Sequence, residues 1–378
     1  MRRTIALDLI HRVASDIRCA ATIVLAGLAI VAGAHSVARA QNAPIPVKLG
    51  ITVSQLTPSL AAYTSLPLYL KYWENEGLKV DVLGVAGSNI AIPMLLSNGL
   101  DFAIPGTGAY FAAVAQGADL TSYYCVFTQN QYRAVSLESG SIKSIGDLKG
   151  AKIGVPDLAS AATVYARSVL RAAGINDETE VEILPFGNSP GLMANGLKQG
   201  QIQAVFGFDN TEGGLKALGL PLRELKSPLD ARFGCGAVLM TRKSDLEKKR
   251  DVAVKLARGI AKATLFAKTN PEAAIRIHWK IFPESKPSGI SEEEALNRAK
   301  QELIARINTM DLEDPKGQFG AIVADRVMGL QDIMYEYNQV KQKLAFGQLF
   351  DTSLLGSIND WDRDAVVRAA KEMTGSPR

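Results

Sequence analysis

Small polar side chains follow six apolar runs of the chain, and their types and spacing suit the binding of a polar solute. Hydroxyls, amides and carboxylates there can hydrogen-bond a ligand, glycines let it approach the backbone, and helix N-termini present unpaired N–H groups. Such groups favour an anion or a polar head group. The predicted site residues are Ser54, Gln55, Thr57, Gly87, Ser88, Asn89, Thr107, Asp157, Ser160, Asn188, Ser189 and Asp209, with Tyr63 beside them.

Several of these residues also have a structural interpretation. Ser65, Ser88 and Ser189 each precede an amphipathic run and, taken singly, are typical of helix caps. Asp157 and Asp209 could bind an amino group or could cap a helix. The set at the strand ends is a stronger indication of a ligand site than any one member.

Aromatic and basic residues near the same strand ends leave two alternatives open. The aromatic residues could wall an organic substrate or could pack in the core; they are Tyr63, Tyr110, Phe186 and Phe208. Arg133 and Arg232 could reach a carboxylate or sulfonate, although surface arginines are the commoner case.

The first forty residues have the order of a secretory signal. Four arginines precede the uncharged run 19–34, and Val37-Ala38-Arg39-Ala40 predicts cleavage after Ala40. A transmembrane anchor is the alternative, but the apolar run is short. The leader carries five arginines and two aspartates, so cleavage lowers the formal charge from +4 to +1. A nearly neutral mature chain is not predicted to bind nucleic acid.

Cleavage also leaves few residues for catalysis or metal binding. Of three histidines only His278 remains, in an amphipathic helix without a nucleophile motif, which indicates a structural histidine. We therefore expect no catalytic residues, no metal and no cofactor. Cys125 and Cys235 remain as well, and they could pair in an oxidising compartment or stay buried thiols.

The elements that carry these residues form a repeat. Val80 to Ile104 and Val181 to Val205 match at a constant offset as strand, helix and strand, and Val47 to Gly50 similarly resembles Ala151 to Gly154. The chain is therefore predicted to make one α/β unit twice. A length of 378 residues and a hydrophobic content of 47% suit two such lobes.

The predicted organisation is a signal peptide over 1–40, the first part of lobe 1 over 41–138, lobe 2 over 139–228, and over 229–378 a return to lobe 1 with C-terminal helices. Two β-rich runs, Leu120 to Phe127 and Arg133 to Leu137, are expected to complete the first sheet. Two crossings between the lobes imply a hinge. Ligands in such folds bind beyond the carboxyl ends of the strands, facing a shared cleft.

Four motifs resemble a known family. Glu76 to Val80, Asn98 to Ala103, Ile145 to Val155 and Gln199 to Ala204 look like segments of the substrate-binding proteins of ABC importers in the nitrate, sulfonate and taurine class. Ala151 stands where that family often has lysine.

The resemblance implies a two-lobed type II periplasmic binding fold that closes on a small solute and delivers it to a membrane permease. It also implies ligand contacts at Ser54, Gly87, Ser88 and Thr107. The predicted function is a monomeric periplasmic receptor for an anionic or polar organic solute. The alternatives are a periplasmic enzyme using Asp157 and Asp209 as acid and base, and a sensory or interaction module working through its helical tail.

Overall fold

The computed structural model describes residues 43–158, 160–310 and 316–373. Within it, Ile45–Arg378 forms one compact unit, on which the following description rests. The predicted signal peptide lies outside the described residues. In the part of the chain that is described, no helix is long and apolar enough to cross a membrane.

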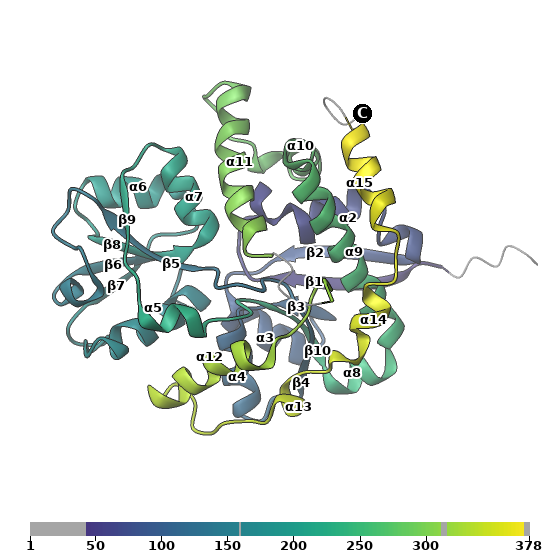
Figure 1. The fold of residues 1–378 in the computed structure, drawn as a ribbon, viewed down its shortest axis with the longest axis horizontal. Helices are drawn as coiled ribbons and strands as arrows, with labels where there is room; N and C mark the ends of the chain where they lie inside the picture. Colours follow the sequence, from purple (N-terminus) through teal and green to yellow (C-terminus); the bar gives the residue numbers. More distant parts are fainter. Residues whose placement is uncertain (1–42, 159, 311–315, 374–378) are drawn as a thin grey trace, which may run out of the picture. The chain divides into compact units, whose positions relative to one another are not determined.

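The first lobe is built on a five-stranded sheet of order β2-β1-β3-β10-β4 (Figure 1). Its strands β1, β2 and β3 are parallel, and β10 runs antiparallel between β3 and β4. The predicted return of the chain to the first lobe at β10 is thereby confirmed. The strand bounds are Ile45–Ile51 for β1, Leu78–Gly84 for β2, Phe102–Ile104 for β3, Leu120–Cys125 for β4 and Val238–Arg242 for β10.

The second lobe repeats this arrangement with the order β7-β6-β8-β5-β9. Its β6, β7 and β8 are parallel, while β5 runs antiparallel to β8. The internal repeat seen in the sequence therefore corresponds to two sheets of equivalent topology, as predicted. The bounds are Tyr132–Leu137 for β5, Lys152–Val155 for β6, Glu182–Pro185 for β7, Ala204–Phe208 for β8 and Leu222–Glu224 for β9.

One strand assignment from the sequence is wrong. The run Arg133 to Leu137 was expected in the first sheet, but β5 pairs with β8 and β9 of the second. The run follows β4 closely in the sequence, which suggested the same sheet, whereas the chain crosses between lobes in the short segment Val126 to Gln131. Each sheet thus receives its antiparallel fourth strand directly after a crossing, β5 in the second lobe and β10 in the first.

Helices flank both sheets, and the C-terminal third is mostly helical. In the second lobe lie α5 (Ala161–Ala172), α6 (Pro190–Lys198) and α7 (Asp209–Ala217). The others are α2 (Ser65–Tyr69), α3 (Ser88–Leu96), α4 (Thr107–Ala115), α8 (Lys243–Lys248), α9 (Arg250–Thr269), α10 (Pro271–Ile281), α11 (Glu292–Asn308), α12 (Ala324–Glu336), α13 (Phe346–Leu349), α14 (Leu355–Ile358) and α15 (Arg363–Glu372).

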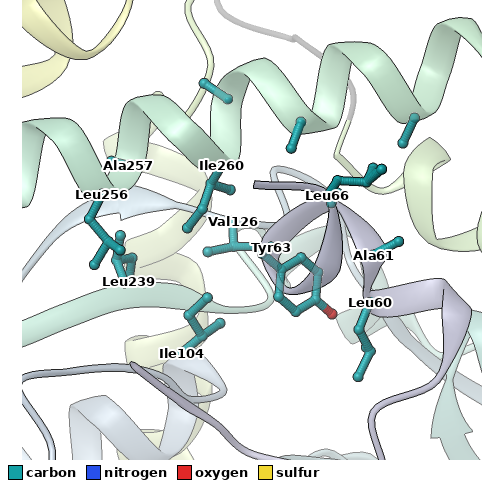
Figure 2. Close-up of a cluster of buried hydrophobic side chains, with 14 of the residues drawn as sticks. Leu60, Ala61, Tyr63, Leu66, Ile104, Val126, Leu239, Leu256, Ala257 and Ile260 are labelled. Carbon is teal, nitrogen blue, oxygen red and sulfur yellow. The ribbon is translucent and has the colours of Figure 1, made fainter. Parts of the chain in front are cut away.

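The core of the first lobe packs the 3₁₀ segment Pro58–Tyr63 between α9 and the sheet. Leu60, Ala61 and Tyr63 are buried there against Leu256 and Ile260 of α9, with Ile104 and Leu239 from the strands (Figure 2). Because the whole 3₁₀ segment is buried, its neighbouring loop is held against the carboxyl end of β1. This packing fixes the position of Tyr63 at the site described below.

Gly320 gives a test of this packing. It has a φ of +78°, and a Cβ built on it would lie 2.0 Å from Cδ2 of Tyr124. We expect Gly320→Ala to lower the free energy of unfolding by about 2 kcal/mol or more, because backbone strain adds to overpacking. Gly219→Ala is the matched control, since Gly219 has a φ of +74° but no atom within 4 Å of its Cβ position. Equal losses in urea unfolding would show that contact with Tyr124 adds nothing.

Candidate ligand-binding site

A cavity of about 60 Å³ lies between the two lobes at the carboxyl ends of the parallel strands. Since one water needs at least about 10–15 Å³ of such space, the cavity has room for several waters or one small organic molecule. The first lobe and the crossing segments contribute Ile51, Thr52, Val53, Gln55, Thr57, Leu60, Tyr63, Ser88, Ile104, Gly106, Phe127, Gln131 and Ala237. The second lobe contributes Ser160, Ala161, Asn188, Pro190, Phe208, Asn210 and Thr211, and α11 adds Glu302 and Arg306.

The structure brings together only part of the predicted site. The predicted site residues that line the cavity are Gln55, Thr57, Tyr63, Ser88, Ser160 and Asn188. The predicted site residues that lie outside the lining are Ser54, Gly87, Asn89, Thr107, Asp157, Ser189 and Asp209. Ser88 and Asn188 therefore face one space from opposite lobes. Ligand contact by any of these residues stays a prediction.

Some polar groups at the strand ends are used by the fold itself. Oγ of Ser88 accepts a hydrogen bond from the Gly106 N–H at 3.2 Å and makes no cap bond in α3, so its predicted capping role is wrong. The hydroxyl of Thr107 is buried and donates to the carbonyl of Cys235. Ser160 does cap its helix, accepting from the Ala162 N–H at 3.2 Å. Ser189 occupies the cap position of α6 without a side-chain cap bond.

The aromatic and basic candidates divide in the same way. Tyr63 and Phe208 line the cavity, whereas Tyr110 packs against Phe111 and Phe350 in the core. Phe186 packs over the Cα atoms of Gly154 and Gly196. Both candidate arginines lie outside the lining and form ion pairs, Arg133 with Glu212 at 3.2 Å and Arg232 with Glu336 at 3.1 Å.

His278 has a structural role, as predicted. Its Nε2 lies 2.9 Å from the Leu56 carbonyl oxygen, which can only accept, so Nε2 donates. Its Nδ1 then accepts from the Ser65 hydroxyl, also at 2.9 Å. Burial lowers the pKa of His278 to about 4, so the ring is neutral at neutral pH. The ring thus fixes the loop before the 3₁₀ segment, and Ser65 is not a side-chain cap.

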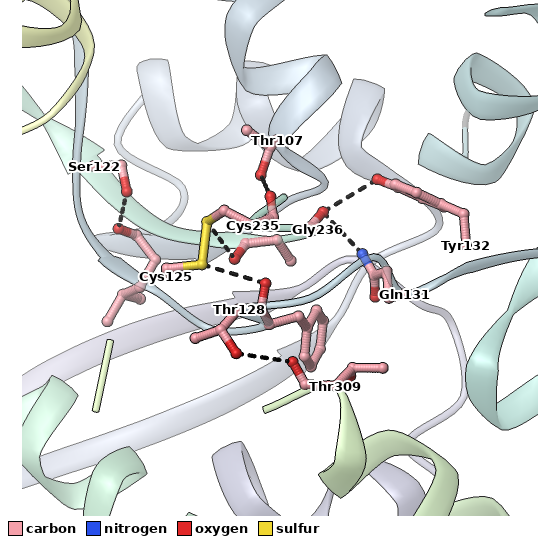
Figure 3. Close-up of a disulfide and its surroundings, with 12 residues drawn as sticks. Thr107, Ser122, Cys125, Thr128, Gln131, Tyr132, Cys235, Gly236 and Thr309 are labelled. Carbon is pink, nitrogen blue, oxygen red and sulfur yellow. Dashed lines mark hydrogen bonds between the residues drawn. A yellow bond between two sulfur atoms is a disulfide. The ribbon is translucent and has the colours of Figure 1, made fainter. Parts of the chain in front are cut away.

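A disulfide joins Cys125 and Cys235, which resolves the alternative left open by the sequence (Figure 3). Cys125 ends β4, where the chain leaves the first lobe, and Cys235 lies just before β10, where it returns. Beside the bond, the Gly236 carbonyl accepts hydrogen bonds from Gln131 and Tyr132 at 2.9 and 3.1 Å (Figure 3). The two crossing segments are therefore tied together next to the cavity.

Arg306 of α11 is a central residue of the site that the sequence did not reveal. Its Nη2 lies 2.7 Å from Oδ1 of Asp209, and the two side chains are 4% and 2% exposed. The guanidinium also donates to Oε1 of Gln131 at 2.6 Å and to Oδ1 of Asn210 at 2.7 Å. It lies over the Phe127 ring at 4.4 Å from the centroid, while Nε is buried without a partner. Arg306 therefore connects a helix of the first lobe, a crossing segment and the second lobe.

The carboxylate of Asp209 belongs to the same network of hydrogen bonds and ion pairs. Its carboxylate pairs with Arg306 and accepts from the Thr309 hydroxyl at 2.9 Å. The carboxylate is thus committed within the protein and lies behind the cavity wall. At the start of α7 it also accepts from the Asn210 N–H at 2.8 Å.

Close packing of α11 on α7 places Arg306 there. The Ser291 hydroxyl begins α11 by accepting from the Glu294 N–H at 3.1 Å, as its capping-box pattern predicted. On α7, a Cβ at Gly213 would lie 3.2 Å from Cβ of Ala305, and one at Gly214 only 2.9 Å from Oε1 of Glu302. The absence of side chains at these two glycines lets a first-lobe helix lie directly on a second-lobe helix.

Glu302 lies one turn before Arg306 and lines the cavity. Burial raises the pKa of its carboxyl group to about 7. Among the described residues no side chain or backbone group forms an ion pair or hydrogen bond with it. In the sequence, the spacing of Arg298, Glu302 and Arg306 at i, i+4 and i+8 indicates one charged face of a helix. This spacing does not show that the face lies at the site, because α11 lies far along the chain from the strand ends.

Two equivalent sheets with a polar cavity between them define a two-lobed periplasmic binding protein fold with a helical C-terminal region. A family model described as NMT1/THI5 like matches residues 68–274, more than half of the chain. The chain belongs to that family.

Two relatives have informative names. A Haemophilus influenzae protein named for thiamine biosynthesis is 24% identical over 226 residues, which are 58% of this chain and 68% of the relative. A Brucella abortus protein named as a binding protein is 30% identical over 164 residues, or 43% of this chain. The match spans about half of the Brucella protein, 48%.

Solved structures agree on the fold. The periplasmic aliphatic sulphonate binding protein SsuA of Escherichia coli matches with a TM-score of 0.57 at 17% identity, covering 81% of this chain and 97% of SsuA. The predicted fold class and the resemblance to importer binding proteins are confirmed. The desulfurization enzyme DszB shares the fold with a TM-score of 0.52 at 15% identity, covering 83% of this chain and 98% of its own, so the fold also supports an enzyme.

Proposed function

We propose that the protein is the solute-binding receptor of an ABC importer, which captures a small polar organic molecule between its lobes by hinge closure. The observation that carries this proposal is the cavity with polar side chains from both lobes, Gln55 and Ser88 on one side and Asn188 and Asn210 on the other. A solute contacting both sides favours the closed state by its differential affinity. Tyr63, Phe127 and Phe208 supply flat apolar walls suited to an organic molecule.

The proposal includes the location and partners expected from the sequence. The leader would direct the mature chain to the periplasm, where it would act as a monomer and deliver its solute to a membrane permease. No chemistry is assigned to the site. The enzyme alternative rested on Asp157 and Asp209, yet Asp209 is bound to Arg306 and neither residue lines the cavity.

A thermal-shift screen tests the receptor function. We expect the mature protein to be stabilised by one class among sulfonates, nitrate, carboxylates and pyrimidines, by about 2.7 kcal/mol when the solute is present at a hundred times its Kd. Gln55→Ala and Asn188→Ala, in opposite lobes, should each weaken binding of that solute about tenfold. Asn195→Ala is the control, because Asn195 is exposed on α6 and lies outside the cavity lining. A flat response to all classes would contradict the receptor function.

A further inference from the structure

Glu302 is the carboxyl group that faces the cavity without a partner among the described residues. Its oxygen Oε1 lies against Gly214 of the second lobe, where a Cβ would come within 2.9 Å. Pro190 is closer still to that position, with Cγ at 2.4 Å. The carboxyl group therefore occupies a fitted space at the lobe junction, and its position is set by packing rather than by a hydrogen bond.

The neighbouring cation does not neutralise Glu302. Arg306 is paired with the carboxylate of Asp209, so its positive charge is balanced by Asp209 and not by Glu302. Among the described residues of the lining, an anionic solute would then meet the Glu302 carboxyl group and an arginine whose charge is already balanced by Asp209. A solute carrying an N–H donor would instead supply what Glu302 lacks, because this half-buried carboxyl group faces the cavity without a partner among the described residues.

Among the described residues, the other titratable groups on the elements packed against α11 are also neutral or have a partner, including Arg250 and Lys268 of α9 and Lys280 of α10. On the 3₁₀ segment the titratable group is Tyr63, whose pKa burial raises, and on α10 His278 is neutral. The ion pairs are Arg298 with Glu294 on α11, Glu212 of α7 with Arg133 and Lys216, Arg276 of α10 with Glu272 and Glu292, Lys255 with Asp251 on α9, and Arg258 and Lys262 of α9 with Glu76.

We infer that Glu302 selects the solute: the receptor takes a flat organic molecule bearing an amidine, amine or amide N–H donor, which binds the Glu302 carboxyl group, and it rejects anions. This inference rests on the proposed receptor function. The aromatic side chains give the flat molecule its walls, and Arg306 Nε, buried without a partner, can donate to a neutral acceptor on the same molecule.

Affinity for a cation should depend on pH in a defined direction. Burial raises the pKa of Glu302 to about 7 in the empty protein, so the carboxyl group is protonated below that pH and ionised above it. A cation prefers the ionised form, so its affinity should rise from pH 6 to pH 8. Below the pKa it should fall by up to about tenfold per pH unit.

Three planar molecules of matched size test this selection: benzamidinium as the cation, benzamide as the neutral donor and benzoate as the anion. Binding is measured by calorimetry and by ligand-observed NMR between pH 6 and pH 8. At pH 8 we expect benzamidinium to bind tightest and benzoate weakest. Glu302→Gln should weaken benzamidinium by about 10- to 100-fold and remove its pH dependence. Glu294→Gln, on the exposed side of the same helix, should leave both unchanged.

Each result decides the inference. A preference for benzoate, equal affinities for all three, no binding of any, or an unchanged pH profile in Glu302→Gln would overturn it. The solute screen separates this failure from failure of the receptor function. If one solute class binds there and proves to be an anion, the receptor function stands and selection by Glu302 does not. If no class binds, the receptor function itself fails.

Discussion

Arg306→Met is expected to destabilise the closed arrangement of the lobes by about 3–5 kcal/mol, because it leaves the buried carboxylate of Asp209 without its cation. The two side chains are 4% and 2% exposed, so solvent cannot replace the lost partner. The pair joins α11 of the first lobe to the start of α7 in the second. Its loss should therefore increase the radius of gyration in small-angle scattering and weaken binding of any solute held by both lobes.

Two further variants separate this effect from a general loss of stability. Arg298→Met lies on the same helix, but its pair with Glu294 is partly exposed, and its loss should change the unfolding free energy by no more than about 0.5 kcal/mol. Adding Asp209→Leu to Arg306→Met removes the uncompensated charge and should restore much of the stability. An unchanged radius of gyration and unfolding midpoint in Arg306→Met would mean that the ion pair does not hold the lobes together.

The sheets were largely predictable because their signals are local. Alternating apolar residues and glycine-terminated helices recur at a constant offset, and this repeat predicted two equivalent parallel units. β5 was assigned to the wrong sheet for a physical reason. A β-rich run predicts that a strand forms. The sheet to which the strand belongs depends on its pairing partners, and Ala134 of β5 pairs with Phe206 of β8, more than seventy residues further along the chain.

The site was only partly predictable from the strand ends. Gln55, Ser88, Ser160 and Asn188 follow β1, β2, β6 and β7, and these positions placed them around one cavity. Whether such a side chain faces a solute or serves the backbone depends on neighbours brought together by folding, as the bonds of Ser88 and Thr107 show. Arg306 and Glu302 were missed because α11 reaches the cavity through its packing on Gly213 and Gly214 of α7.

Loss of the disulfide is the second change for which we expect a large effect, because the bond closes a long loop of the chain. Cys125 and Cys235 are separated by 110 residues, and the loop between them contains all five strands of the second sheet. A cross-link over a loop of this length removes much conformational entropy from the unfolded chain, by about 4–5 kcal/mol in the chain-entropy model. It also holds the outgoing and returning crossing segments side by side at the base of the cavity.

Reduction of the mature protein, or the double substitution Cys125→Ser and Cys235→Ser, should therefore lower the free energy of unfolding by about 2–5 kcal/mol in urea titrations. The double variant should respond to reductant no further, which separates loss of the covalent bond from the change of side chain. Because the bond lies beside Gln131, which donates to the Gly236 carbonyl and accepts from Arg306, reduction should also weaken solute binding. Equal unfolding curves with and without reductant would show that the hydrogen bonds at the crossings suffice. A stability loss with unchanged affinity would instead confine the disulfide to restraining the unfolded chain.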